Sequence, residues 1–245
     1  MSDELKRAFG LEGERALITG GGTGLGFAMA KCFVQAGADV VITGRREDML
    51  KEAVKQLGPK ADYRVFDVTD TEHAASFVQT LNREVGPVSI LVNNAGRHCK
   101  KPVLDVHLMG SFALTKAVVP GMLEQKKGNI LFISSMSAYL GMTQVTAYSA
   151  AKSAVLGLVK TLSGELADKG IRVNAIAPGF IDTPMFRKAV ESDIPRQQKI
   201  IGHTPMGCYG DPMDIGWAAV YLTSPAARFV TGVCLPVDGG CCIGF

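Results

Sequence analysis

The chain alternates between short apolar runs and longer segments in which apolar residues recur every three or four positions. The short runs are rich in Val, Ile and Leu and predict buried strands, whereas the longer segments predict helices. Helices are expected at residues 27–34, 47–57, 71–85, 103–125 and 148–169, and strands at 16–19, 40–43, 63–66, 90–92, 130–133, 172–176 and 233–237. This alternation predicts an α/β fold: a doubly wound parallel sheet of seven strands flanked by helices, in a single domain over residues 1–245.

Composition narrows the classes of function. The chain has 245 residues, 47% of them apolar and 20% charged, which suits one large α/β domain with a buried core. The net charge is +3 without a basic cluster, so nucleic-acid binding has no support. No apolar run approaches the roughly 18 residues of a membrane span, and the first ten residues lack a signal-peptide core.

The cysteines favour a reduced, cytoplasmic protein without a metal site, because their spacing matches no zinc pattern. Cys32 falls on an apolar helix face and is expected to be buried. A redox role for the adjacent pair near the end of the chain is the less favoured alternative. The six cysteines are Cys32, Cys99, Cys208, Cys234, Cys241 and Cys242.

A glycine-rich turn follows the first predicted strand and precedes the first predicted helix. Strand, glycine turn and helix in this order form a dinucleotide-binding turn, in which the backbone approaches a pyrophosphate at a helix N-terminus. A glycine turn without a ligand is the alternative. The candidate cofactor-binding residues of this turn are Gly20, Gly22, Thr23, Gly24, Leu25 and Gly26.

The end of the second strand bears on which nicotinamide cofactor binds. An acidic residue there would hold a ribose 2′-hydroxyl and indicate NAD, but Gly44 occupies the place, followed by Arg45 and Arg46. Arginines can pair with a 2′-phosphate, so NADP(H) is favoured and NAD(H) stays possible. As alternatives, the arginines are solvated charges, or Arg45 stacks on an adenine.

Tyr148 and Lys152 lie four positions apart in a predicted helix and therefore share one of its faces. An ammonium beside a phenol favours the phenolate and lowers the pKa of the phenol from about 10, so that it can exchange protons with an alcohol. Ser135, at the end of the preceding strand, is a candidate to reach the same oxygen, and its spacing to Tyr148 favours it over the neighbouring Ser134.

These motifs together resemble the short-chain dehydrogenase/reductase family over residues 14–240. The matching residues occur in order: Thr19 to Gly26, Asp67-Val68, Asn93 to Gly96, the Ser135, Tyr148 and Lys152 set, Pro178-Gly179 with Ile181 and Thr183, and Val237 to Gly240. The resemblance is to members of the gluconate 5-dehydrogenase and 3-oxoacyl-carrier-protein reductase types. It implies a Rossmann fold and an NAD(P)-dependent oxidoreductase that interconverts a secondary alcohol and a ketone.

The resemblance also implies roles. Tyr148 would be the general acid or base, Lys152 would lower the pKa of that phenol and bind the nicotinamide ribose, and Ser135 would hold the substrate oxygen. Asn93 would either line the cleft or tie strands together, and Asp67 would contact the adenine or only cap a turn. The other implied cofactor-binding residues are Val68, Asn94, Ala95, Gly96, Pro178, Gly179, Ile181 and Thr183.

Departures from the family pattern concern the site. His107 stands where many members have an Asn whose backbone carbonyl holds a water linked to the Lys, so His107 is a candidate for a proton relay or only for packing. The segment between Gly96 and His107 is also shorter than usual, and Cys208 replaces an Arg.

Specificity is expected from residues 136–146 and from a mobile lid at 180–204. A sugar, polyol or sugar acid is the favoured substrate class, and a 3-oxoacyl thioester is the alternative. A cofactor-binding regulatory or scaffold protein with little turnover is a hypothesis of another class. The resemblance further implies a homotetramer or homodimer joined through the helices at 103–125 and 149–169.

Overall fold

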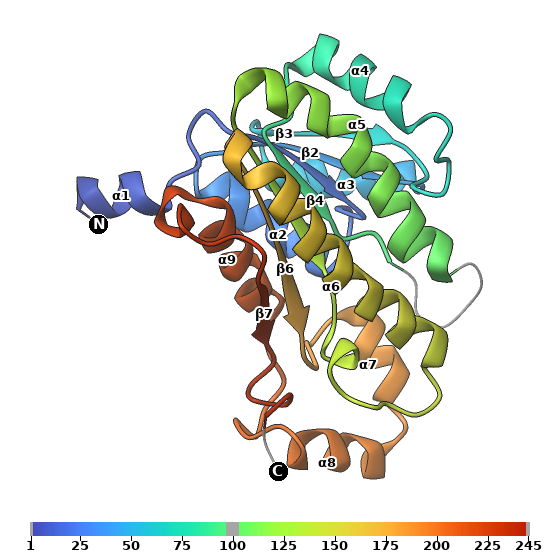
Figure 1. Ribbon diagram of the computed structural model, residues 1–245. Coiled ribbons are helices and arrows are strands. Elements are labelled where there is room, and N and C mark those ends of the chain that lie inside the picture. The colour runs from blue at the N-terminus through green and yellow to red at the C-terminus, as the bar shows by residue number, and fades with distance from the viewer. Residues whose placement is uncertain (1, 97–102, 244–245) are drawn as a thin grey trace.

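A computed structural model describes residues 2–96 and 103–243. All strand pairs in its seven-stranded sheet are parallel, and the order is β3-β2-β1-β4-β5-β6-β7 (Figure 1). The strand order reverses between β1 and β4, which opens a crevice at the carboxyl ends of these strands. The predicted doubly wound sheet is thus confirmed. The strands are β1 (Arg15–Thr19), β2 (Asp39–Gly44), β3 (Ala61–Val65), β4 (Ile90–Asn93), β5 (Gly128–Ile133), β6 (Ile171–Pro178) and β7 (Cys234–Val237).

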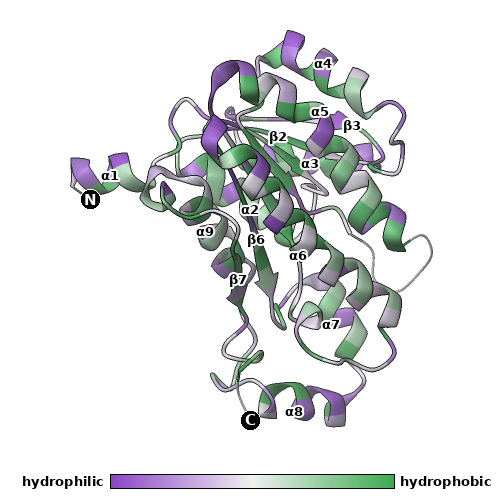
Figure 2. Ribbon diagram, viewed as in Figure 1, coloured by the Kyte–Doolittle hydropathy of each residue, from purple (hydrophilic) through white to green (hydrophobic). Residues whose placement is uncertain are grey.

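Helices cover both faces of the sheet (Figure 1). One face packs against α2 (Gly24–Gln35), α3 (Glu47–Leu57) and α9 (Pro212–Thr223), and the other against α4 (Ala74–Val85), α5 (Gly110–Gln125) and α6 (Thr146–Leu166). Each face of the sheet thus has its own hydrophobic core, the first beneath α2, α3 and α9 and the second beneath α4, α5 and α6. Because successive strand side chains point to opposite faces, Ile18 lies in the first core and Leu17 in the second. Figure 2 shows the hydrophobic strands between these layers and hydrophilic residues on the outlying α1 (Asp3–Phe9).

Within residues 2–96 and 103–243, four α-helices were not expected from the sequence: α1, α7 (Pro184–Val190), α8 (Ile194–Gly202) and α9. Local capping starts the last three, because a Thr or Asp side chain accepts a hydrogen bond from the first turn and a Pro stands at its beginning. Such short helices contain too few turns to show a clear repeat of apolar residues in the sequence. α7 and α8 fall within the segment that was expected to be a lid.

Some predicted boundaries were wrong by a few residues. α2 begins inside the glycine turn, α4 begins at Ala74 and not at residue 71, and α6 ends at Leu166 before a short 3₁₀ turn that reaches Lys169. The predicted helix at 103–125 includes a π-helical turn, Asp105–Met109, before α5. This turn places His107 on the side of the crevice.

Among the described residues, one helix, Asp105–Gln125, is long and apolar enough by length and composition to cross a membrane. The sequence prediction missed it because polar residues such as Ser111 and Thr115 interrupt the apolar run. Leu114, Val118 and Met122 bury one face of this helix in the second core. Packing against the sheet therefore explains why much of this helix is apolar.

Candidate active site

The glycine turn wraps the start of α2 at the carboxyl end of β1. Gly20 and Gly24 adopt positive φ angles of 64° and 56°, which favour glycine. A Cβ on Gly26 would lie 2.2 Å from the Gly20 carbonyl oxygen, so only glycine allows this close approach. Among the described residues, Thr23 makes no side-chain cap hydrogen bond at the start of α2. The amide groups of the first turn thus remain available to an anionic ligand.

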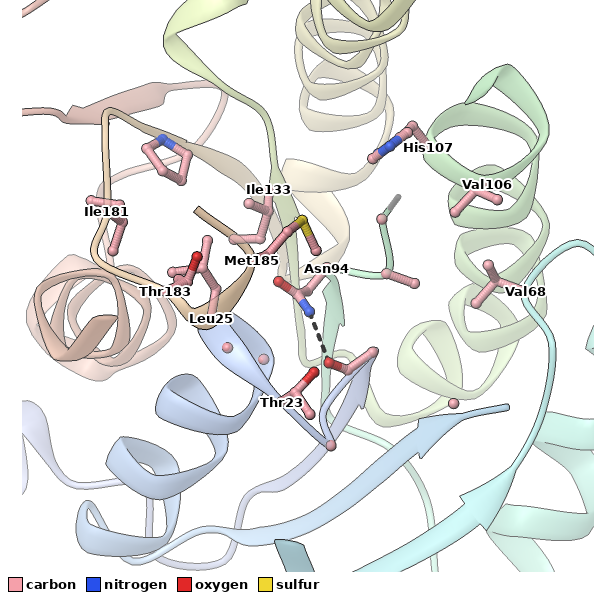
Figure 3. Close-up of a pocket in the computed structure, with 18 of the residues that line it drawn as sticks. Thr23, Leu25, Val68, Asn94, Val106, His107, Ile133, Ile181, Thr183 and Met185 are labelled. Carbon is pink, nitrogen blue, oxygen red and sulfur yellow. Dashed lines mark hydrogen bonds between the residues drawn. The ribbon is translucent and has the colours of Figure 1, made fainter. Parts of the chain in front are cut away.

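Asn94 fixes the glycine turn to the end of β4. Its side-chain Nδ2 donates to the carbonyl oxygens of Thr19, at 2.8 Å, and of Gly20, at 3.3 Å. In return, Thr19 Oγ1 accepts hydrogen bonds from the backbone amides of Asn94, at 3.0 Å, and Ala95, at 2.9 Å. These contacts set the shape of the cleft, and Figure 3 shows Asn94 beside the turn.

Arg45 and Asp67 meet across one end of the cleft. Arg45 Nη1 lies 3.7 Å from Asp67 Oδ2, and both side chains are partly exposed. Asp67 Oδ1 also accepts hydrogen bonds from the Thr69 amide, at 3.0 Å, and hydroxyl, at 2.8 Å. The Asp67 carboxylate therefore caps a turn and faces the cleft at the same time. Gly44 leaves space here, because a Cβ would come no closer than 3.7 Å to Leu50.

Lys152 is buried one helical turn from Tyr148. Its Nζ lies 5.6 Å from the centroid of the Tyr148 ring and donates a 2.6 Å hydrogen bond to the Ile133 carbonyl oxygen at the end of β5. Only 4% of the residue is exposed, and burial lowers the pKa of the Lys152 amine to about 7. Tyr148 itself is half-buried. The cleft thus holds a phenol beside an amine that changes charge near neutral pH.

The two serines at the end of β5 differ in their contacts. The Ser134 hydroxyl donates to the Lys152 carbonyl oxygen at 3.0 Å and so ties α6 to β5. The Ser135 oxygen accepts a 3.1 Å hydrogen bond from the Ser137 amide, which leaves its own proton for another acceptor. Both residues line the cleft, and the contacts favour Ser135 as the one that can bind a substrate oxygen.

The segment after β6 closes the other side of the cleft. A Cβ on Gly179 would lie 2.6 Å from the Asp238 Cα, so this glycine allows the chain after β7 to pack close by. Thr183 Oγ1 accepts a 3.2 Å hydrogen bond from the Phe186 amide and caps α7. Figure 3 shows Ile181, Thr183 and Met185 facing the glycine turn across the cleft.

The structure brings the residues predicted for catalysis or cofactor binding together in one cleft of about 430 Å³, with the exception of Asn93. Asn93, for which a structural role was the alternative, does not line it: its Nδ2 donates to Thr115 Oγ1 at 3.1 Å and joins β4 to α5. The predicted short segment before His107 lies largely at residues 97–102, outside the described residues, as does Cys99. The predicted residues in the cleft are Gly20, Gly22, Thr23, Gly24, Leu25, Gly26, Arg45, Arg46, Asp67, Val68, Asn94, Ala95, Gly96, His107, Ser135, Tyr148, Lys152, Pro178, Gly179, Ile181 and Thr183.

Sequence reasoning missed mainly the apolar walls of the cleft. Apolar residues there carry no local signal that separates them from core residues, and only the tertiary fold turns them toward the cleft. The missed residues are Met49, Leu50, Phe66, Val106 and Ile133.

Comparison with known proteins agrees with this geometry. A family model described as enoyl-(acyl carrier protein) reductase matches residues 20–242, nearly the whole chain. The chain belongs to the short-chain dehydrogenase/reductase family. The resemblance drawn from the sequence motifs is confirmed, and as a member of this family the chain is an NAD(P)-dependent oxidoreductase that acts on hydroxyl and keto groups.

The similar proteins include both types that the sequence motifs suggested. The chain is 36% identical to the 3-oxoacyl-(acyl-carrier-protein) reductase FabG of Vibrio harveyi, over 94% of this chain and 98% of the relative. It is also 36% identical to the 2-dehydro-3-deoxy-D-gluconate 5-dehydrogenase of Formosa agariphila, over 95% and 94%. A crystal structure of a gluconate 5-dehydrogenase from Burkholderia cenocepacia J2315, in complex with NADP and tartrate, matches with a TM-score of 0.90 and 34% identity, over 97% and 98%.

Proposed function

We propose that this short-chain dehydrogenase/reductase uses NADP(H) to interconvert a secondary alcohol and a ketone of a sugar acid. The observation that carries the proposal is the buried Lys152 amine one turn from Tyr148, at the edge of a cleft that begins at a dinucleotide-type glycine turn. A phenol beside a cation can accept an alcohol proton or donate a proton to a developing alkoxide.

Ser135, Tyr148 and Lys152 have different roles in this reaction. Ser135 donates its hydroxyl proton to the substrate oxygen, and Tyr148 transfers a proton to or from that oxygen. Because Lys152 has a pKa of about 7, protonation of its amine and formation of the Tyr148 phenolate favour each other near neutral pH. The hydrogen bond from Lys152 to the Ile133 carbonyl holds the amine in place during this exchange.

The residues of the cleft fit a dinucleotide. The glycines with positive φ angles and the uncapped amides in the first turn of α2 suit a pyrophosphate. Arg45 and Arg46, at the end of the cleft formed by β2, suit a 2′-phosphate. Asp67 and Val68 would hold the adenine, and Pro178, Gly179, Ile181 and Thr183 the nicotinamide end. When bound, the nicotinamide donates or accepts the hydride, and the protein supplies orientation and the proton.

Gly44→Asp should reverse the cofactor preference. The substitution places a carboxylate where the fold leaves room, so it repels a 2′-phosphate and accepts a hydrogen bond from a 2′-hydroxyl. We expect the ratio of kcat/KM for NADPH to that for NADH to fall by about 100-fold. Asp39→Asn, at the opposite end of β2, is the matched control and should leave the ratio unchanged. An unaltered ratio in Gly44→Asp would remove the support for NADP(H).

The substrate class rests on the relatives. Sugar-acid dehydrogenases recur among the similar proteins, in sequence and in structure. A 3-oxoacyl thioester is the second candidate, favoured by the relative from Vibrio harveyi and by the apolar walls that Val106, Met185 and Phe186 give the cleft. Cofactor-linked turnover with a keto sugar acid and with a 3-oxoacyl thioester separates the two. A higher kcat/KM for the keto sugar acid supports the proposal, and the reverse order refutes the substrate class alone.

The assembly and location are part of the proposal: a cytoplasmic homotetramer, or a homodimer, joined through α5 and α6. Met109 and Leu123, on the helix that contains α5, are 50% and 37% exposed in a single chain. Contact with a neighbouring subunit would remove these apolar side chains from water. Light scattering of the purified protein should give about four, or at least two, times the mass of one chain. A monomer at micromolar concentration would contradict this assembly.

A further inference from the structure

The described residues that line the cleft leave no lysine or arginine to bind the carboxylate of a sugar acid. Three of them are lysines or arginines: Arg45, Arg46 and Lys152. The two arginines follow β2, on the side proposed for a 2′-phosphate, and the Lys152 amine is buried and donates to the Ile133 carbonyl. A substrate carboxylate near Tyr148 therefore needs a positive group that lies just outside the cleft lining.

Arg187, on α7, lies beside the part of the chain that borders this end of the cleft. Every residue of 178–186 except Asp182 lines the cleft, and Arg187 follows directly. Its backbone amide donates to the Thr183 carbonyl at 2.9 Å, one helical turn back. Figure 3 shows Met185, two residues before Arg187, pointing into the cleft. The Arg187 backbone is thus fixed to the edge of the cleft.

The Arg187 guanidinium holds a carboxylate of its own chain. Its Nε donates to Asp182 Oδ1, and its Nη2 donates to Asp182 Oδ2 at 2.6 Å, so the two groups pair through two hydrogen bonds. The hydrogen bond from Arg187 lowers the pKa of the Asp182 carboxyl, which is therefore ionised at neutral pH. Asp182 thus pairs with the guanidinium in the way that the carboxylate of a substrate would.

This ion pair can open without disturbing the backbone around it. The Arg187 side chain is 72% exposed and the Asp182 side chain is 33% exposed, and ion pairs in contact with water contribute little to stability. The Asp182 backbone is held separately, because its amide donates to the Gly210 carbonyl at 2.8 Å. The guanidinium can therefore exchange one carboxylate for another while the chain at the edge of the cleft keeps its place.

We propose that Arg187 is a specificity-determining residue that exchanges Asp182 for the carboxylate of a keto or hydroxy sugar acid. The inference rests on the proposed interconversion of sugar acids. A guanidinium presents its N–H groups in a planar fork that matches a carboxylate, whereas the neighbouring Lys188 offers only a point charge. The exchange breaks no covalent bond and moves no proton. Because a neutral sugar gains nothing from it, Arg187 selects acids over neutral sugars of the same size.

A comparison of two substrates tests this role. Arg187→Met should raise KM for a keto sugar acid by about 10- to 100-fold and leave KM for the corresponding neutral keto sugar unchanged. The affinity for NADPH and kcat should stay at the wild-type values, which also shows that the variant is folded. Arg196→Met, which removes the same charge from α8, is the matched control and should change neither KM. An unchanged KM for the acid in Arg187→Met, or an equal rise for both substrates, would overturn the proposal.

Asp182→Asn provides a prediction of opposite sign. The substitution removes the charge that competes with the substrate, so KM for the keto sugar acid should fall by about 2- to 5-fold. In the Arg187→Met background the same substitution should have no effect, because the guanidinium that it releases is absent. An unchanged or higher KM in Asp182→Asn alone would contradict the exchange.

Turnover of the keto sugar acid by the wild type is measured first. Its absence refutes the proposed substrate class, and the role of Arg187 is refuted with it. Turnover by the wild type together with an unchanged KM in Arg187→Met refutes the role of Arg187 alone.

Discussion

Tyr148→Phe should lower kcat by about 100- to 10,000-fold while the affinity for NADPH stays close to that of the wild type. The substitution removes the oxygen that exchanges the substrate proton and keeps the ring that His107 and Lys152 contact. Steady-state turnover measures the first effect, and titration of cofactor fluorescence measures the second. The combination is expected of a general acid or base, because the cofactor cleft is otherwise unchanged.

Tyr221→Phe is the matched control, since it removes a phenol oxygen from α9, outside the cleft. It should leave kcat unchanged. The same experiment separates catalysis from the alternative of a regulatory or scaffold protein. Such a protein would bind NADPH equally well in the wild type and in Tyr148→Phe and would show no turnover in either. Full activity in Tyr148→Phe would contradict the assigned role.

Lys152→Met should abolish most of the activity and make the folded protein more stable at neutral pH. Burial lowers the pKa of the Lys152 amine from 10.5 to about 7. Between these two values the unfolded chain binds a proton that the folded chain lacks, so the contribution of Lys152 to the free energy of unfolding rises as the pH increases. Below about pH 7 the folded chain carries the buried charge, and the cost is largest there.

We therefore expect Lys152→Met to raise the free energy of unfolding at neutral pH by roughly 1–4 kcal/mol, less any loss from the hydrogen bond to the Ile133 carbonyl. The gain should disappear near pH 10, which urea denaturation at both pH values would measure. Lys160→Met, two turns further along α6 and exposed, is the control and should change little. A stability gain that does not depend on pH would show that the buried charge is not its cause.

The sequence predicted most of the sheet for a physical reason. Strands of a parallel sheet are buried on both faces, so they read as continuous runs such as Ile90-Leu91-Val92, and glycines mark where the chain turns. The helices α7 and α8 escaped prediction because a capping Thr or Asp and a Pro start them without a long apolar repeat. The π-helical turn around His107 also has no clear sequence signal.

The candidate site was predicted where chemistry demands a particular side chain. Tyr148, Lys152 and the glycines are recognisable from residue type and spacing, whereas wall residues such as Phe66 and Val106 are not. Two alternatives left open by the sequence depend on tertiary contacts. The Ser134 hydroxyl donates to the Lys152 carbonyl, which favours Ser135 as the residue that binds a substrate oxygen, and the Asn93 side chain donates to Thr115 outside the cleft.

The most direct test of the central claim is the stoichiometry of turnover by the purified wild-type protein with NADPH and a keto sugar acid. The account predicts steady consumption of NADPH with formation of one hydroxy acid for each NADPH oxidised, and loss of both in Tyr148→Phe. Tight NADPH binding by the wild type without any turnover of keto sugar acids or 3-oxoacyl thioesters would contradict it.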